Sequence, residues 1–213
     1  MTEHVIDYRP RPRKRVYIKL SGGRSFTIPV SACESIGQGT VLSEAEVERL
    51  FRLGQYYLGK DKAFRLLAIR ARTRQEIESA LDGLSLEPSI CRGLMEELEA
   101  LGLVDDVRFA REYIQTKMEV RQFGPHRLKY QLSKLGIKKP VIEAALAEAF
   151  DPGLQEELAW KLVDKKLTRQ KLDEKSIRRI GGLLRRSGFD YEVVNRVSYA
   201  LLKRIGQDVE DSY

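Results

Sequence analysis

The pattern of hydrophobic and polar positions changes near residue 43 of the chain. Before that point, apolar and polar residues alternate over residues 15–30, which is typical of strands whose side chains point to opposite faces. Gly22 and Gly23 interrupt the alternation, and glycines tolerate the positive φ of a tight turn. The segment predicts a small β-hairpin, which must pack against a neighbouring element because isolated hairpins are marginally stable.

From residue 43 onward, apolar residues recur every three or four positions, as in amphipathic helices. Ser43 and Thr73 each stand three residues before a glutamate, which predicts a capping box at a helix start. Proline at the first helical position indicates further starts, at Pro88, Pro125, Pro140 and Pro152.

Three segments share one pattern, in which a helix ends at a glycine followed by an apolar residue and a second helix. The glycines are Gly83, Gly136 and Gly188, 53 and 52 residues apart, and each is expected to end its helix in left-handed backbone. A further helix precedes each pair, over 61–71, 105–120 and 154–167. The sequence therefore predicts a mainly α fold of tandem three-helix repeats, stacked in an elongated, curved array.

These patterns divide the chain into six segments. They are a basic arm with the β-hairpin (1–42), a linking helix (43–60), three-helix repeats at 61–104, 105–150 and 151–206, and an acidic tail (207–213).

The composition narrows the class of protein. The 213 residues carry 38 basic and 31 acidic side chains, a formal net charge of +7. No apolar run approaches the roughly 20 residues of a membrane span, and the start of the chain lacks the apolar region of a signal peptide. Two cysteines fit a reducing compartment. We expect a cytoplasmic monomer that does not associate with membranes.

The charge is unevenly distributed. Residues 9–24 hold seven basic side chains and no acid, and residues 120–142 hold six and no acid. Residues 71–119 are acidic, with a net charge of −5, and residues 154–206 are basic again, with +6. Acid-poor basic stretches are the footprint of polyanion binding, although a solvated surface explains any one of them equally.

Motifs for catalysis are missing from the sequence. It has no cysteine–histidine cluster, no P-loop and no nucleophile elbow, so neither an enzyme nor a cofactor is expected. Adjacent Asp105 and Asp106 would point to different sides of a helix, and one of them is expected to cap a helix start. Trp160 and four tyrosines could stack on bases, but their helical spacing favours packing in or beside the core; the tyrosines are Tyr56, Tyr57, Tyr113 and Tyr130.

The basic positions are the remaining functional candidates. Three lie on the helix after Gly124-Pro125, whose N-terminal amides would add attraction for phosphate. Four more lie on the equivalent helix of the third repeat, and stacked repeats would bring such positions onto one face as a continuous stripe, the alternative being separate solvated side chains. The candidate residues for nucleic-acid or filament binding are Arg127, Lys129, Lys134, Arg169, Arg178, Arg179, Arg185 and Arg186.

Several segments resemble the RecX family of bacterial regulatory proteins: AIRARTRQEIESAL (68–81), LVDDVRFAREYI (103–114), FGPHRLKYQLSKLGI (123–137) and RRSGFDYEVV (185–194). The resemblance implies an all-helical protein of three-helix repeats. It also implies binding to the RecA recombinase filament in its groove, on single-stranded DNA, with inhibition of strand exchange, ATP hydrolysis and coprotease activity. No catalytic residue accompanies it. The matching motif consists of Asp105, Asp106, Arg108, Phe109, Ala110, Gly124, Pro125 and Arg127. Its aspartates, Phe109, Ala110, Gly124 and Pro125 are interpreted as structural, and Arg127 as a contact.

Three functions stay open at this stage. The first is a RecA-filament modulator acting in DNA repair and the SOS response, with duplex DNA as a further candidate ligand. The second is a nucleic-acid-binding protein without a recombinase partner, and the third is a helical scaffold for another protein. The first 60 residues depart from shorter family members, and could either dock on the array or add a DNA contact.

Overall fold

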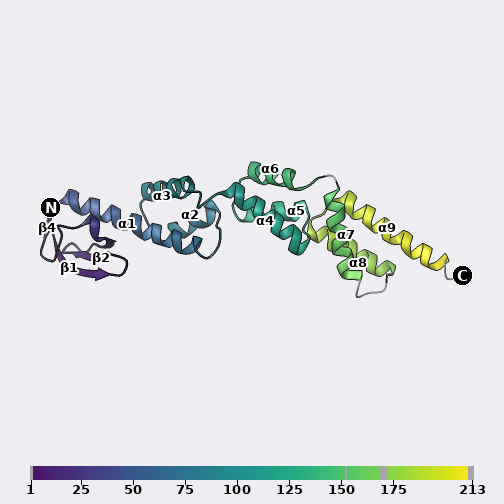
Figure 1. Cartoon of the computed structure of the whole chain (residues 1–213), viewed down its shortest axis with the longest axis horizontal. Coiled ribbons are helices and arrows are strands. Elements are labelled where there is room, and N and C mark those ends of the chain that lie inside the picture. Colours follow the sequence, from purple (N-terminus) through teal and green to yellow (C-terminus); the bar gives the residue numbers. More distant parts are fainter. Residues whose placement is uncertain (1, 152, 168–171, 211–213) are drawn as a thin grey trace. The chain divides into compact units, whose positions relative to one another are not determined.

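The computed structural model of the chain describes residues 2–151, 153–167 and 172–210 (Figure 1). It divides into two compact units, Met1–Val104 and Asp105–Tyr213. The described residues form nine α-helices and a small four-stranded antiparallel sheet. The predicted mainly α class is confirmed. Among the described helices, none has the length and apolar character needed to cross a membrane.

The first unit opens with the sheet, whose strand order is β3-β2-β1-β4. Its strands are β1 (Glu3–Arg11), β2 (Arg15–Leu20), β3 (Ser25–Pro29) and β4 (Val41–Leu42). The predicted hairpin is the β2–β3 pair, in which Val16 is paired with Ile28 and Ile18 with Phe26. Gly23 supplies the positive φ of its turn, at 89°.

The prediction of a basic arm ahead of the hairpin is wrong, because residues 3–11 form a further strand of the sheet. β1 is paired with β2 from Val5 to Arg11. A register shift between Val5 and Asp7 breaks the alternation of β1, so its sequence does not show a clean period of two. Arg13 and Lys14 lie in the connecting turn, with φ of 64° and 53°.

One long helix, α1 (Glu44–Leu67), serves both halves of the first unit. Its N-terminal Val47 and Leu50 are buried in one core with the sheet, while Ala63 is buried in a second core with the helices that follow. The boundary expected between residues 60 and 61 therefore falls inside a continuous helix. Gly54 allows the close approach of the sheet, since a Cβ there would lie 2.4 Å from the Cβ of Phe26.

Helices α2 (Arg74–Asp82) and α3 (Pro88–Ala100) complete the first three-helix set. The capping boxes predicted at Ser43 and Thr73 are both present. The left-handed backbone expected at Gly83 is wrong: its φ is −64°, and Ser85 takes the positive φ instead, at 52°. The turn that reverses the chain thus lies two residues beyond the glycine.

The second unit contains two three-helix sets around one core. The first consists of α4 (Asp106–Arg121), α5 (Pro125–Lys134) and α6 (Lys139–Ala149), and the second of α7 (Leu154–Leu167), α8 (Glu174–Ser187) and α9 (Tyr191–Glu210). Gly136 and Gly188 have positive φ, at 81° and 87°, as predicted. Residues 207–210 of the expected acidic tail belong to α9, while Pro152 and residues 211–213 lie outside the described residues.

Candidate nucleic-acid interface

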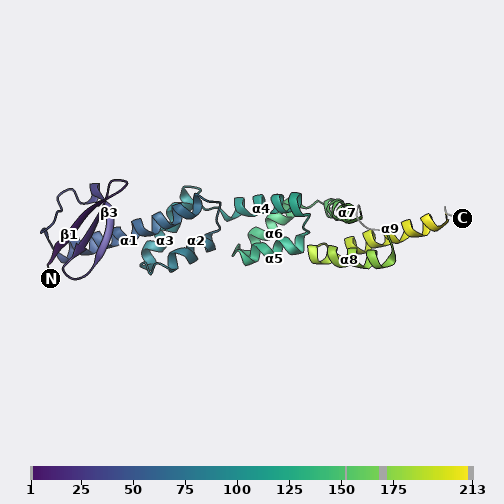
Figure 2. The same ribbon diagram turned by 90° about the horizontal axis from the view of Figure 1, so that it is seen from below.

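The C-terminal end of α8 meets the N-terminal end of α5 (Figure 2). The amide of Gly124 donates to the carbonyl oxygen of Ser187 at 2.8 Å, and the amide of His126 donates to that of Gly188 at 3.1 Å. Carbonyls at the end of one helix thus satisfy amides at the start of the other. Two backbone positions at this helix start have no amide hydrogen to offer a phosphate, because Pro125 has no N–H and the His126 amide is already bonded to Gly188.

Arg127 is tied to this junction. Its Nη1 donates to the carbonyl oxygen of Arg186 at 3.0 Å, and its guanidinium carbon lies 4.1 Å from the centre of the Phe123 ring. Both contacts are within the chain, and the side chain is half-buried. The geometry therefore gives Arg127 a structural role where α8 meets α5. Its external contact, expected from the sequence, stays a prediction.

The two lysines of α5 point to different sides. Lys129 forms an ion pair with Glu143 of α6 at 3.0 Å, and Lys139 lies 3.8 Å from the same carboxylate. Lys134 instead lies over the Tyr130 ring, 5.6 Å from its centre, and Tyr130 is 63% exposed. A stripe that combines Lys129 with Lys134 is therefore not present on α5.

The exposed face of α8 concentrates positive charge. Ile177, Ile180 and Leu184 are buried in the core. At about 100° per residue, the exposed basic residues fall within an arc of about 120° on the other side. They are Lys175, Arg178, Arg179, Arg185 and Arg186.

Few acids neutralise this face. Arg178 lies 3.7 Å from Glu174, but both side chains are at least 75% exposed, so the pair is weak. Among the residues that the structure describes, Arg179, Arg185 and Arg186 form no ion pair. We name the five residues the α8 basic face. Lys175 was missed from the sequence although it stands four residues before Arg179, and Arg169 lies outside the described residues.

The basic stripe does not continue onto α2, the equivalent helix of the first set. That helix carries Glu76, Glu78 and Asp82, and its Arg74 forms an ion pair with Glu78 at 2.8 Å. The equivalent helices α2 and α8 therefore carry unlike charge, and the α8 basic face has no counterpart on α2.

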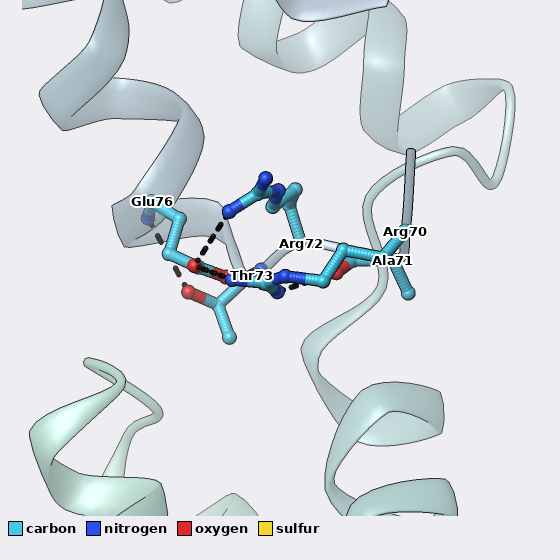
Figure 3. Close-up of polar contacts among 5 residues, drawn as sticks. All are labelled: Arg70, Ala71, Arg72, Thr73 and Glu76. Carbon is cyan, nitrogen blue, oxygen red and sulfur yellow. Dashed lines mark hydrogen bonds and ion pairs between the residues drawn. The ribbon is translucent and has the colours of Figure 1, made fainter. Parts of the chain in front are cut away.

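Arginines ahead of α2 are also engaged within the chain (Figure 3). The Glu76 carboxylate accepts hydrogen bonds from Arg70 at 2.5 Å, from Arg72 at 3.2 Å and from the amide of Thr73 at 3.1 Å. Burial raises the pKa of Glu76, but the hydrogen bonds from Arg70 and Thr73 outweigh it and hold the pKa below its ordinary value. This cluster fixes the start of α2 and offers no free cation for a ligand.

Comparison with known proteins identifies the architecture of the second unit. Residues 105–146 match the family model described as RecX, second three-helix domain. The chain is 34% identical over 146 residues to the regulatory protein RecX of Mycolicibacterium smegmatis, across 64% of this chain and 77% of that protein. It belongs to the RecX family. The RecX protein of Mycolicibacterium vanbaalenii is 36% identical over 134 residues, or 72% of its length.

Solved RecX structures share the fold. A crystal structure of a regulatory protein RecX covers 91% of this chain with a TM-score of 0.66 and 23% identity. RecX from Lactobacillus salivarius covers 69% of the chain with a TM-score of 0.61 and 27% identity.

The RecX-like motif lies inside the matched domain and is explained by packing. Asp105 caps α4, its carboxylate accepting from the amides of Val107 and Arg108 at 2.9 Å. Phe109 stacks on Tyr113 at 6.0 Å, and Ala110 is fully buried. Asp106 lies in the first turn of α4, where the helix dipole favours an acid. Gly124 and Pro125 belong to the α5–α8 junction.

Most aromatic candidates of this RecX-family chain pack internally. Tyr56 donates to Glu97 at 2.6 Å and accepts from Lys60 at 2.8 Å. The hydrogen bond to Glu97 raises the pKa of Lys60 to about 12. Trp160 is half-buried beneath the guanidinium of Arg204. Exposed Tyr130 is thus the best placed of the five aromatic candidates for contact with a base.

The described residues contain no grouping of three or more His, Cys, Asp or Glu side chains that could hold a metal ion. Cys33 is buried and Cys91 half-buried, both as free thiols.

Proposed function

We propose that the chain binds the RecA recombinase filament on single-stranded DNA and inhibits its strand-exchange, ATPase and coprotease activities. It acts as a cytoplasmic regulator without catalytic activity or cofactor, in recombination, DNA repair and the SOS response. Its relatives are named regulatory proteins RecX, which supports a regulatory role.

The observation that carries the proposal is the α8 basic face. Five exposed cations on one helix, with Asp173 and Glu174 as the acids at its start, form a local positive field that attracts a polyanion. DNA held in a protein filament presents phosphates along a groove, and a helix surface can follow such a groove. Lys134 and Tyr130 lie on α5, which begins where α8 ends.

The acidic stretch of residues 71–119 is suited to binding a basic protein surface rather than DNA. Residues 71–119 have a net charge of −5, and Glu96 is exposed without an ion pair among the described residues. We assign this stretch to basic protein surface of the recombinase, while the α8 basic face contacts DNA. Two partners in one assembly account for the charge order better than naked DNA alone.

Strand exchange tests the proposal. RecA, single-stranded circular DNA and homologous linear duplex are mixed with increasing amounts of the purified chain, and joint molecules are followed on a gel. We expect suppression at or below one chain per RecA monomer. A parallel reaction with a recombinase-independent annealing readout identifies a stand-alone nucleic-acid-binding protein: equal suppression of both reactions would support that alternative, and unchanged exchange would refute the proposal.

A further inference from the structure

The outer face of the N-terminal sheet gathers a second set of basic side chains. Strand pairing places Arg9 opposite Tyr17, Arg11 opposite Arg15 and Asp7 opposite Lys19. Directly opposed residues of antiparallel strands share a face. The other face carries Val16, Ile18 and Leu20, all buried. The polar set therefore lies on the side of the sheet that faces away from its core.

Several of these cations have no acid to neutralise them. Arg9 is paired with Asp7 at 2.8 Å, and Arg15 with Asp61 at 2.7 Å. Within the described part of the chain, Arg11 and Lys19 form no ion pair, and both are exposed. The turn between β1 and β2 adds Arg13 and Lys14, also exposed and unpaired there. We name Arg11, Arg13, Lys14 and Lys19 the sheet basic face.

An aromatic ring and a cavity lie beside these charges. Tyr17 is half-buried, with the guanidinium of Arg11 5.6 Å from its ring centre. Next to it, a cavity of about 530 Å³ is lined by Tyr17, Thr27, Phe51, Leu58 and Leu86, among others. Its volume lies within the range of small-ligand sites, about 300–1,000 Å³, and its walls combine apolar and polar groups.

We propose that a single-stranded polynucleotide binds across the outer face of this sheet. Its phosphates contact the sheet basic face, and an unpaired base stacks at Tyr17 and enters the adjoining cavity. Cations along a backbone path, combined with an aromatic platform, are the elements of sequence-tolerant single-strand binding. A paired base cannot reach the ring or the cavity, so single strands are preferred over duplex. This site lies in the first unit and needs no recombinase, so it goes beyond the proposed function.

Fluorescence anisotropy of the full chain with labelled oligothymidylate of about 16 nucleotides tests the phosphate contacts. The variant carries Arg11→Gln and Lys19→Gln. The control carries Arg49→Gln and Arg92→Gln, which remove two exposed cations from α1 and α3. We expect the variant to bind at least about tenfold more weakly, and to lower the salt slope of log K by about 1.4 for two lost phosphates. The control should retain wild-type affinity, and equal loss in both would overturn the proposal.

Tyr17→Leu tests the stacking step while it keeps an apolar side chain at that position. We expect affinity for the oligothymidylate to fall by about fivefold or more, with weak duplex binding unchanged. Equal affinity of the wild type for duplex and single strand would overturn the base contact. If Tyr17→Leu lowers the melting temperature, the Arg11→Gln/Lys19→Gln variant still tests the proposal, because both of its substituted side chains are exposed.

The result can be separated from that of the proposed function. The Arg11→Gln/Lys19→Gln variant is also assayed for suppression of RecA strand exchange. Lost DNA affinity with retained suppression supports the sheet site and the proposed function together. Unchanged DNA affinity of this variant overturns the sheet site, whatever the result of the strand-exchange assay. Lack of suppression by the wild type overturns the proposed function alone.

Discussion

Gly124 and Gly188 approach each other so closely that a Cβ on Gly124 would lie 2.4 Å from the carbonyl oxygen of Gly188. A Cβ on Gly188 would in turn lie 2.3 Å from the amide nitrogen of Arg127. Two RecX-like segments that lie some 60 residues apart in the sequence thus form one junction, in which the end of α8 caps the start of α5. This junction connects the two three-helix sets of the second unit.

Alanine at either glycine should destabilise the second unit. Gly188→Ala adds backbone strain at φ 87° to the steric clash, and we expect a loss of about 1–3 kcal/mol in the free energy of unfolding. Gly124→Ala meets backbone atoms that cannot move aside. Gly182→Ala is the matched control, because a Cβ there meets only the guanidinium end of Arg186 at 3.3 Å and alanine favours a helix interior. Urea denaturation followed by circular dichroism measures all three, and a neutral Gly188→Ala would contradict the described junction.

Arg127 should contribute to stability more than its neighbours on the surface. Arg127→Ala removes the hydrogen bond to the Arg186 carbonyl and the contact with the Phe123 ring, for an expected loss of about 1–2 kcal/mol. Arg179→Ala, on an exposed site without an ion pair in the described chain, should stay within about 0.5 kcal/mol of wild type. The same urea titration compares them. Equal losses of unfolding free energy in Arg127→Ala and Arg179→Ala would contradict a structural role for Arg127.

Stability of the first unit should fall in acid. The hydrogen bond from Lys60 lowers the pKa of Glu97, and that of Glu76 is also below its ordinary value. Carboxylates with lowered folded-state pKa values stabilise the fold above their unfolded value of about 4.3, and this stabilisation is lost as pH falls through the folded values. Lys60 contributes at alkaline pH. Its stabilisation of the fold is complete below its unfolded pKa and is lost as pH rises through its folded pKa of about 12.

The free energy of unfolding, measured in urea between neutral pH and about pH 3, tests this dependence. Glu97→Gln should lower stability at neutral pH and flatten the acid limb, because the titrating carboxylate is gone. Glu96→Gln is a matched control on the exposed side of α3, and it should leave the curve nearly unchanged. Parallel curves for wild type and Glu97→Gln would show that the Lys60–Glu97 pair does not contribute.

Local signals predicted much of the fold. The capping boxes at Ser43 and Thr73 were visible because a cap needs two residues at one fixed spacing. The left-handed backbone of Gly136 and Gly188 was visible in the same way, because a glycine followed by an apolar residue marks a helix end. By contrast, the sequence does not predict β1, because the register shift between Val5 and Asp7 hides its period of two. The continuity of α1 depends on two separate cores, which no local pattern reveals.

The site was harder to predict, because charge alone does not tell which side a residue faces or what it contacts. Lys129 and Lys134 stand five residues apart, yet one is paired with Glu143 and the other lies over Tyr130. Arg127 matched the family motif, and its partner is a carbonyl 59 residues away. Contacts of this kind come from the packing of α5 against α6 and α8, which no local pattern reveals.

The most direct test of the central claim is the ATPase rate of RecA on single-stranded DNA in the presence of the chain. The wild type is compared with Lys175→Glu/Arg179→Glu/Arg186→Glu on the α8 basic face, and with Arg49→Glu/Arg92→Glu in the first unit as the charge-reversed control. We predict that the wild type and the control suppress hydrolysis while the α8 variant, folded by circular dichroism, suppresses it at least about tenfold less well per mole. Full suppression by the α8 variant, or none by the wild type, would contradict the account.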